Sequence, residues 1–172
     1  MAIDKIQSES INLADTFAFT GTVTGAGEAN TPAWNAYLGS QQSLVGDAYA
    51  LINADTELLD TNSAYDTTNK RFTVPSGHAG SYFWYIIIRE TYDTDIELRL
   101  ALHKNGSMTQ QYRVQLNPNG NAGRCYQTSG IIELAVGDYV DARYFIGTGS
   151  PSGVLDNGSD NTKFGGFKIR GS

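Results

Sequence analysis

The sequence has little of what most catalytic, metal-binding or disulfide-bonded proteins depend on. Among its 172 residues there are one cysteine and two histidines. A single cysteine excludes an intrachain disulfide and a cysteine-based metal site. No partner motif accompanies Cys125, so we interpret it as a small strand residue and not as a nucleophile. His78 and His103 have no adjacent serine or carboxylate motif, and we interpret both as solvated surface histidines.

Charge is scarce as well, and it is not clustered. Charged residues make up 17% of the chain, no run of one sign occurs, and the net charge is −6. An acidic protein of this kind is not expected to bind nucleic acid through its phosphates. No window approaches the ~20 apolar residues of a membrane span, and the N-terminus lacks the apolar core of a signal peptide. We therefore expect a soluble protein that is made in a cytoplasm and does not insert into a membrane.

Glycine and tyrosine are abundant instead, with 19 and 10 copies, which suits strands and turns. No window shows a sustained helical period, and strand signals recur at short spacing from Ala33 onward. This spacing predicts an all-β protein with roughly ten strands in two stacked sheets. The expected strands cover residues 33–38, 48–52, 57–59, 71–74, 82–89, 95–103, 108–116, 124–134, 139–146 and 162–170.

The most informative stretch runs from Tyr65 to Glu90. It passes from a turn through the short strand 71–74 and a glycine corner to the most apolar run of the chain, 82–88. That run is apolar at consecutive positions, so both of its faces should be away from water. Further on, Asn105-Gly106 is the strongest hairpin signal, because a type I′ turn needs positive φ at both central residues.

Residues 1–32 form a separate N-terminal segment. Residues 25–32 have turn chemistry throughout and are interpreted as a linker. A segment of about 30 residues is too short to fold alone, so it must pack on the main domain, on another copy or on a partner. We interpret 1–32 as an anchoring arm and 33–172 as a head. The candidate anchor residues are Ile11, Leu13, Phe17 and Phe19.

Five motifs occur in order over residues 33–172. They are Tyr-Asp before a Phe strand, Pro followed by Gly-x-Tyr-x-aromatic, Lys-Asn-Gly, Gly-Asp-x-Val, and a closing Phe-x-Gly. In this order they resemble the globular head of complement component one, subcomponent q, a branch of the tumour necrosis factor-like jelly rolls. The glycine usual before the Phe strand is replaced by Asn69-Lys70, and asparagine tolerates the left-handed turn conformation. The signature residues are Tyr65, Phe72, Pro75, Gly80, Asn105, Gly106, Gly137, Asp138, Val140 and Gly166.

The resemblance implies a ten-stranded jelly-roll β-sandwich that assembles as a threefold-symmetric homotrimer and is not catalytic. The residues favour assembly independently, because surplus aromatic surface on strand faces is typical of subunit interfaces. The candidate trimer-interface residues are Tyr82, Trp84, Tyr85, Tyr139, Tyr144 and Phe164.

Acidic side chains form two groups that could hold calcium through oxygen ligands. Asp93, Asp95 and Glu97 form one, and Asp156 and Asp160 the other. Neither spacing matches an EF-hand loop, so we interpret both as solvated turns, with a calcium ion left open. No run singles out a catalytic carboxylate pair, and the glycine-rich segment 147–158 precedes a strand and not a helix. We therefore expect no enzyme and no cofactor.

The arm sequence DTFAFTGTVTGAG followed by such a head resembles small structural proteins of tailed bacteriophages. This resemblance implies a non-enzymatic virion protein that is assembled in the bacterial host cytoplasm. It would form a trimeric knob or short fibre on capsid or tail, with the arm joined to other virion proteins. Loops 117–123 and 147–161 would contact a host glycan or protein. The alternative is a free-standing trimeric adhesin or glycan-binding module.

Overall fold

The computed structural model describes residues 30–92, 96–116, 123–147 and 152–171. In these ranges the chain forms strands and turns, and none of it is a helix that could span a membrane. The strands are β1 (Ala33–Leu38), β2 (Gln42–Ser43), β3 (Tyr49–Leu51), β4 (Ala54–Asp60), β5 (Tyr65–Asp66), β6 (Arg71–Thr73), β7 (Gly80–Tyr92), β8 (Ile96–Lys104), β9 (Ser107–Leu116), β10 (Arg124–Leu134), β11 (Tyr139–Ile146), β12 (Gly153–Leu155) and β13 (Lys163–Gly171).

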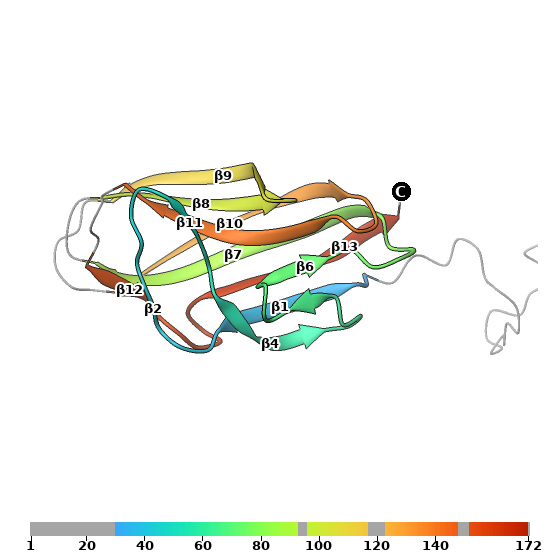
Figure 1. Ribbon diagram of the computed structural model, residues 1–172, viewed down its shortest axis with the longest axis horizontal. Helices are drawn as coiled ribbons and strands as arrows, with labels where there is room; N and C mark the ends of the chain where they lie inside the picture. The colour runs from blue at the N-terminus through green and yellow to red at the C-terminus, as the bar shows by residue number, and fades with distance from the viewer. Residues whose placement is uncertain (1–29, 93–95, 117–122, 148–151, 172) are drawn as a thin grey trace, which may run out of the picture.

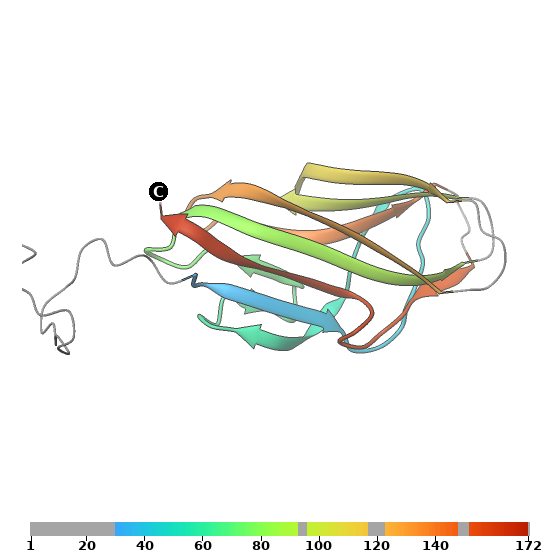
Figure 2. The ribbon, with the colours of Figure 1, turned by 180° about the vertical axis from the view of Figure 1, so that it is seen from behind.

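The strands form two antiparallel sheets that pack face to face (Figures 1 and 2). Sheet A has the order β2-β12-β7-β13-β1-β4, with β10 paired along the other edge of β7. Sheet B has the order β5-β6-β11-β8-β9, with β3 paired to β11. The long β7 is therefore the centre of sheet A, since β13 and β12 share one of its edges and β10 takes the other.

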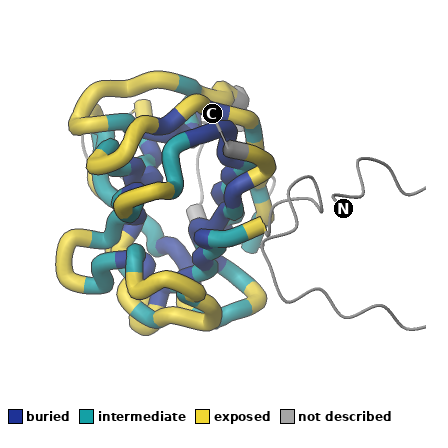
Figure 3. The backbone as a smooth tube through the Cα atoms, turned by 90° about the vertical axis from the view of Figure 1, so that its right-hand side faces the viewer, coloured by how far each residue is buried: buried dark blue, intermediate teal, exposed yellow. Residues whose placement is uncertain are grey.

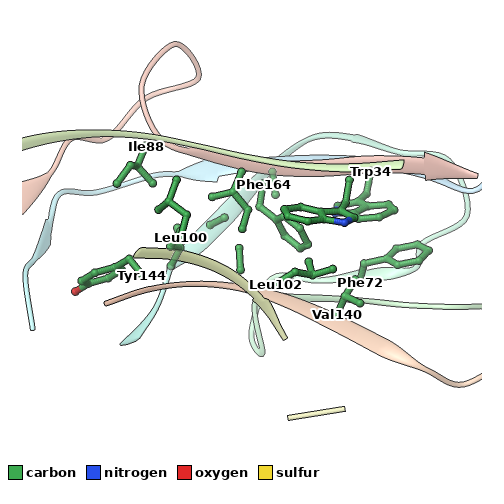
Figure 4. Close-up of a cluster of buried hydrophobic side chains, with 14 of the residues drawn as sticks. Trp34, Phe72, Ile88, Leu100, Leu102, Val140, Tyr144 and Phe164 are labelled. Atoms are coloured by element: carbon green, nitrogen blue, oxygen red, sulfur yellow. The ribbon is translucent and has the colours of Figure 1, made fainter. Parts of the chain in front are cut away.

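The core lies between the two sheets. In the end-on view, the buried residues line the inside of the sandwich (Figure 3). Trp34 of sheet A and Phe72 of sheet B stack with ring centroids 3.9 Å apart and an interplanar angle of 8° (Figure 4). Phe164 meets the Trp34 ring edge-on at 5.6 Å. Such aromatic contacts add to the burial of apolar area, so these rings bind the two sheets together. Leu98, Leu100 and Leu102 of β8 complete the core from sheet B.

The strands expected from the sequence are present with small changes at their ends. Those expected at 33–38, 124–134 and 139–146 have the predicted bounds. The described residues form thirteen strand segments where about ten were expected, because β2, β5 and β12 were not predicted. Each of those three has only two or three residues, too few for a periodic pattern to appear. The presence of β12 also means that 147–161 is not loop throughout. The candidate anchor residues Ile11, Leu13, Phe17 and Phe19 lie outside the described residues.

Two signature motifs meet in space at one pair of turns. Asn105 and Gly106 have φ of 51° and 81°, as the type I′ prediction requires. The Asp138 carboxylate accepts from Lys104 Nζ at 2.7 Å, from Asn105 Nδ2 at 2.7 Å and from the Ala135 amide at 2.8 Å. Lys-Asn-Gly and Gly-Asp-x-Val are thus the two halves of one hydrogen-bonded unit.

The turn before β6 keeps its shape in a different way from the one expected. The residue with positive φ is Lys70, at 55°, and not Asn69. Asn69 instead donates through its backbone amide and its side chain to the carboxylate of Asp66, which closes the turn. The left-handed residue is therefore a lysine held by its neighbours.

Candidate functional site

The most distinctive surface of the molecule is the outer face of sheet A. Along β7, Tyr82, Trp84, Ile86 and Ile88 point into the core and are at most 1% exposed. The alternate residues Phe83, Tyr85 and Ile87 point outward and are partly exposed. The run is apolar on both faces, but its outer residues are partly exposed in the single chain, so the expectation that both faces are away from water stays a prediction. The core needs only one of the two sets, so the second set forms an apolar surface on the outside of the head.

The apolar surface continues onto the strands beside β7. Phe167 of β13 lies beside Phe83, with ring centroids 5.4 Å apart. On β10, Ile131 pairs with Phe83 and is 59% exposed. Register places these side chains on the same face, because residues opposite each other in a sheet point the same way. We call Phe83, Tyr85, Ile87, Ile131 and Phe167 the sheet A patch.

A hollow of about 410 Å³ lies in this face. The apolar side of its lining is made of Phe83, Tyr85 and Ile87 of β7. The remaining lining residues are polar, from β10 and β13, and are Gln127, Thr128, Ser129 and Lys163.

Gly165 of β13 has no side chain, and this allows the Tyr85 ring to pack directly against the backbone of the neighbouring strand. A methyl group built on Gly165 would come within 2.4 Å of the Tyr85 hydroxyl and 2.5 Å of its Cζ atom. The Tyr85 ring therefore occupies the space that any side chain at this position would need. Burial raises the pKa of the Tyr85 hydroxyl.

Four of the six predicted interface residues were assigned to the wrong surface. Tyr82, Trp84, Tyr144 and Phe164 are each at most 1% exposed within a single chain, so they belong to its core. Tyr139 lies on the opposite sheet, where the Arg71 guanidinium sits 4.4 Å from its ring centroid. Of the six, only Tyr85 lies on the sheet A patch. Sequence reasoning missed Phe83, Ile87 and Phe167, although strand alternation puts the first two on the same face as Tyr85.

The histidine interpretation is also corrected at one position. His103 is only 6% exposed, and the ring of Tyr49 lies 5.4 Å from its own. Burial, followed by the nearby Arg143, lowers the pKa of His103. The strand pattern placed it correctly on the outward side of β8, but the long side chains of neighbouring strands cover that side.

Two of the acidic side chains considered for calcium, Asp156 and Glu97, are paired with arginines, whereas Asp160 is exposed. Asp156 contacts Arg89 at 2.9 Å, and Glu97 is hydrogen-bonded to Arg99 and Arg113. Asp93 and Asp95 lie outside the described residues. Across the described ranges, no three metal-ligating side chains come together.

Comparison with known proteins places the fold among jelly rolls. No family model and no curated protein matches the sequence. The globular domain of the zebrafish complement 1qA protein matches with a TM-score of 0.57 at 17% identity, covering 83% of this chain and all of that one. The Eiger tumour necrosis factor of S. frugiperda gives 0.58 at 14% identity, covering 81% and 93%. Murine APRIL gives 0.56 at 12%, covering 80% and 98%.

The chain has the complement-head and tumour necrosis factor-like jelly-roll fold. At these identities the likeness establishes the fold alone, so activity and partners have to be argued from this chain's own surfaces.

Proposed function

We propose that this chain is a non-enzymatic head that assembles as a homotrimer through the outer face of sheet A. The observation that carries the proposal is the sheet A patch with its open hollow. Apolar and aromatic side chains gathered on one face are typical of surfaces that another protein covers. Identical copies meeting at such a face form a closed ring when the rotation between them closes, and three copies is the number that the resemblance implies.

We further propose that the trimer is a structural protein of a tailed phage virion, a knob or short fibre on capsid or tail. The support is the arm sequence together with the position where it joins the head. The described chain begins at the end of the sandwich where the C-terminus lies (Figures 1 and 2). The strand ends that flank 93–95, 117–122 and 148–151 lie at the opposite end. A head attached to a particle through residues 1–32 would thus present that opposite end outward.

In this proposal the protein acts by geometry and not by chemistry. Three identical heads displayed together convert weak single contacts with a host surface into useful avidity. No reaction is assigned to any side chain, and the virion is the place where we expect the protein to be found.

A second candidate function is a free-standing glycan-binding module. The observation that favours it is the composition of the hollow, in which aromatic rings lie beside the polar side chains of Gln127, Thr128 and Ser129. A concave site with an apolar floor and a few polar groups is the usual form of a small-ligand site. This function requires the face to stay open to solvent.

Light scattering of the purified chain at micromolar concentration distinguishes the two. We expect a trimer for the wild type, and a monomer for the double variant Phe83→Ser/Tyr85→Ser, which removes two rings from the sheet A patch. Val136→Ser is the matched control, because Val136 is 52% exposed in the turn before β11 and should leave the mass unchanged. A monomeric wild type that binds sugars on a glycan array would overturn the trimer and favour the module.

A further inference from the structure

We propose that the outer face of sheet B binds an acidic polysaccharide, that is, a sugar chain bearing carboxylate or sulfate groups. The proposal rests on four arginines, one on each of four neighbouring strands. Arg71 lies on β6, Arg143 on β11, Arg99 on β8 and Arg113 on β9. This surface lies on the other side of the sandwich from the sheet A patch.

The register of the strands arranges these arginines in a diagonal. Arg71 pairs with Asp141, and Arg143 follows two residues along the same strand. Arg99 pairs with Phe145, two residues further still, and also with Arg113. Each step from β6 to β8 therefore moves one strand across and two residues along in the same direction. We call these four residues the arginine diagonal.

The diagonal is long enough to follow an extended polymer. Neighbouring strands lie about 4.8 Å apart and two residues span about 6.7 Å, so Arg71 and Arg143 are separated by about 8 Å, as are Arg143 and Arg99. With the same strand and residue spacings, the distance across the sheet from Arg71 to Arg113 is about 20 Å. A charge repeated along an extended chain could meet several of these side chains at once.

The arginines are held in place by contacts within the face. The Arg99 guanidinium lies 4.5 Å from the ring centroid of Phe145, and Arg71 is stacked in the same way on Tyr139. Arg143 donates from Nε to Asp141 at 2.6 Å. Guanidinium groups stacked on rings lose less freedom on binding, and they present planar, paired donors to carboxylate or sulfate oxygens.

Positive charge remains after the ion pairs inside the face are counted. Arg99 and Arg113 share the single carboxylate of Glu97, and Asp141 is the partner of Arg143. The Nε atom of Arg71 is buried and has no hydrogen-bond partner among the described residues. Asp66 of β5 pairs with Arg71 and lies on the same face, so four cations face three carboxylates, on a protein whose net charge is −6. An anionic ligand is the partner whose charge complements this face.

Ring and amide groups between the arginines favour a sugar chain over an acidic peptide. The Tyr49 hydroxyl donates to Gln111 Oε1 at 2.6 Å, although β11 and β8 lie between their strands. The Tyr49 side chain therefore lies across the face, tilted beside Phe145 with centroids 5.4 Å apart. Partly exposed rings, a hydroxyl and an exposed amide are the groups that pack on and hydrogen-bond to sugar rings.

The inference does not depend on trimer formation, because the whole diagonal belongs to one chain. We would measure it by calorimetry at pH 7 with a short oligogalacturonate in solution, so that avidity has no part in the affinity. The test variant is Arg71→Gln/Arg113→Gln, which removes both ends of the diagonal; Arg113 is 60% exposed and its loss should be tolerated by the fold. The control for loss of an exposed arginine elsewhere is Arg170→Gln, on β13 of sheet A.

We expect the wild type and the control to bind oligogalacturonate or its sulfated form, with affinity that falls as salt is raised. We expect the double variant to bind at least about tenfold more weakly, since each charged hydrogen bond contributes that much or more. Equal binding by the double variant and the control would overturn the proposal. So would absence of wild-type binding to either oligomer, equal binding to neutral dextran, or tighter binding to polyglutamate.

Discussion

At the scale of single residues, Asp138 holds together two turns that carry two of the five sequence motifs. Its carboxylate accepts hydrogen bonds from the Lys104 side chain, the Asn105 side chain and the Ala135 amide. The donation from Lys104, and then that from Asn105, lowers the pKa of Asp138 to about 2 from its ordinary 3.8. Each hydrogen bond favours the ionised form, so folding and ionisation of this group support each other.

Asp138→Asn should therefore weaken the fold in a pH-dependent way. Because the folded pKa is depressed, the stabilisation is present above pH 3.8 and is lost as the pH falls toward about 2. At neutral pH we expect a loss of about 1.5–3 kcal/mol, as for a charged hydrogen bond. Urea denaturation at a series of pH values from 7 to 2 measures the difference in free energy of unfolding between wild type and variant. This difference should become smaller below pH 4.

Glu57→Gln serves as the control for this prediction, because Glu57 is exposed on β4. It should change the free energy of unfolding by less than about 0.5 kcal/mol at neutral pH. If the difference in free energy of unfolding between wild type and Asp138→Asn were the same at every pH, the ionised carboxylate would not be the group that joins the turns.

At the scale of elements, β7 and β13 show how one pair of strands serves two surfaces. Trp84 faces the core and donates from its indole nitrogen to Gln110 at 2.9 Å. Tyr85, the next residue, faces outward over Gly165, while Gly166 leaves room for the ring of Trp34 on the inner side. Two adjacent glycines thus admit large rings on opposite faces of the same strand.

Substituting these glycines one at a time should separate folding from assembly. A methyl group at Gly166 would meet the Phe83 carbonyl oxygen and the Trp34 ring, both at 2.4 Å, so Gly166→Ala should cost about 1–3 kcal/mol of stability. The three atoms nearest to a methyl group at Gly165 all belong to the Tyr85 side chain, which can swing outward. Gly165→Ala should keep the stability within about 1 kcal/mol and reduce the fraction of trimer. Thermal unfolding and light scattering measure the two effects.

The reverse pattern would contradict this account of the two faces. If Gly165→Ala unfolded the chain, Tyr85 would be a core residue. If it left both stability and mass unchanged, the position of the Tyr85 ring would have no part in assembly.

At the scale of the whole molecule, the head and the arm should be separable. The Pro32 carbonyl accepts from the Lys168 amide at 3.0 Å, so contact with the head begins before β1. Deleting residues 1–29 keeps this contact. We expect the shortened chain to be soluble and to have the same number of subunits as the full chain.

In the proposed virion role the shortened chain should no longer join particles. The measurement is incorporation into phage particles assembled in its presence, detected by antibody. A finer variant replaces Ile11, Leu13, Phe17 and Phe19 by Ser in the full chain and should have the same effect. A shortened head that still incorporates normally would contradict the anchor role of residues 1–32.

The sequence by itself determined the fold and most of its strands. Strands such as β10 and β11 have the predicted bounds because their alternation is long enough to be read, and Asn105-Gly106 fixes its hairpin through positive φ alone. These features are local, so they can be read along the chain. The apolar nature of both faces of β7 could also be predicted from the sequence, because it depends only on which residues follow one another along the chain.

The tertiary structure decided which residues lie on which surface. Trp84 and Tyr85 look alike in the sequence, and only the packing of sheet B against one face of β7 places the first in the core and the second outside. His103 became buried because Tyr49, 54 residues earlier, lies across its strand. The arginine diagonal depends on the register between strands that are distant in sequence. Register and sheet packing are non-local, and no pattern along the chain specifies them.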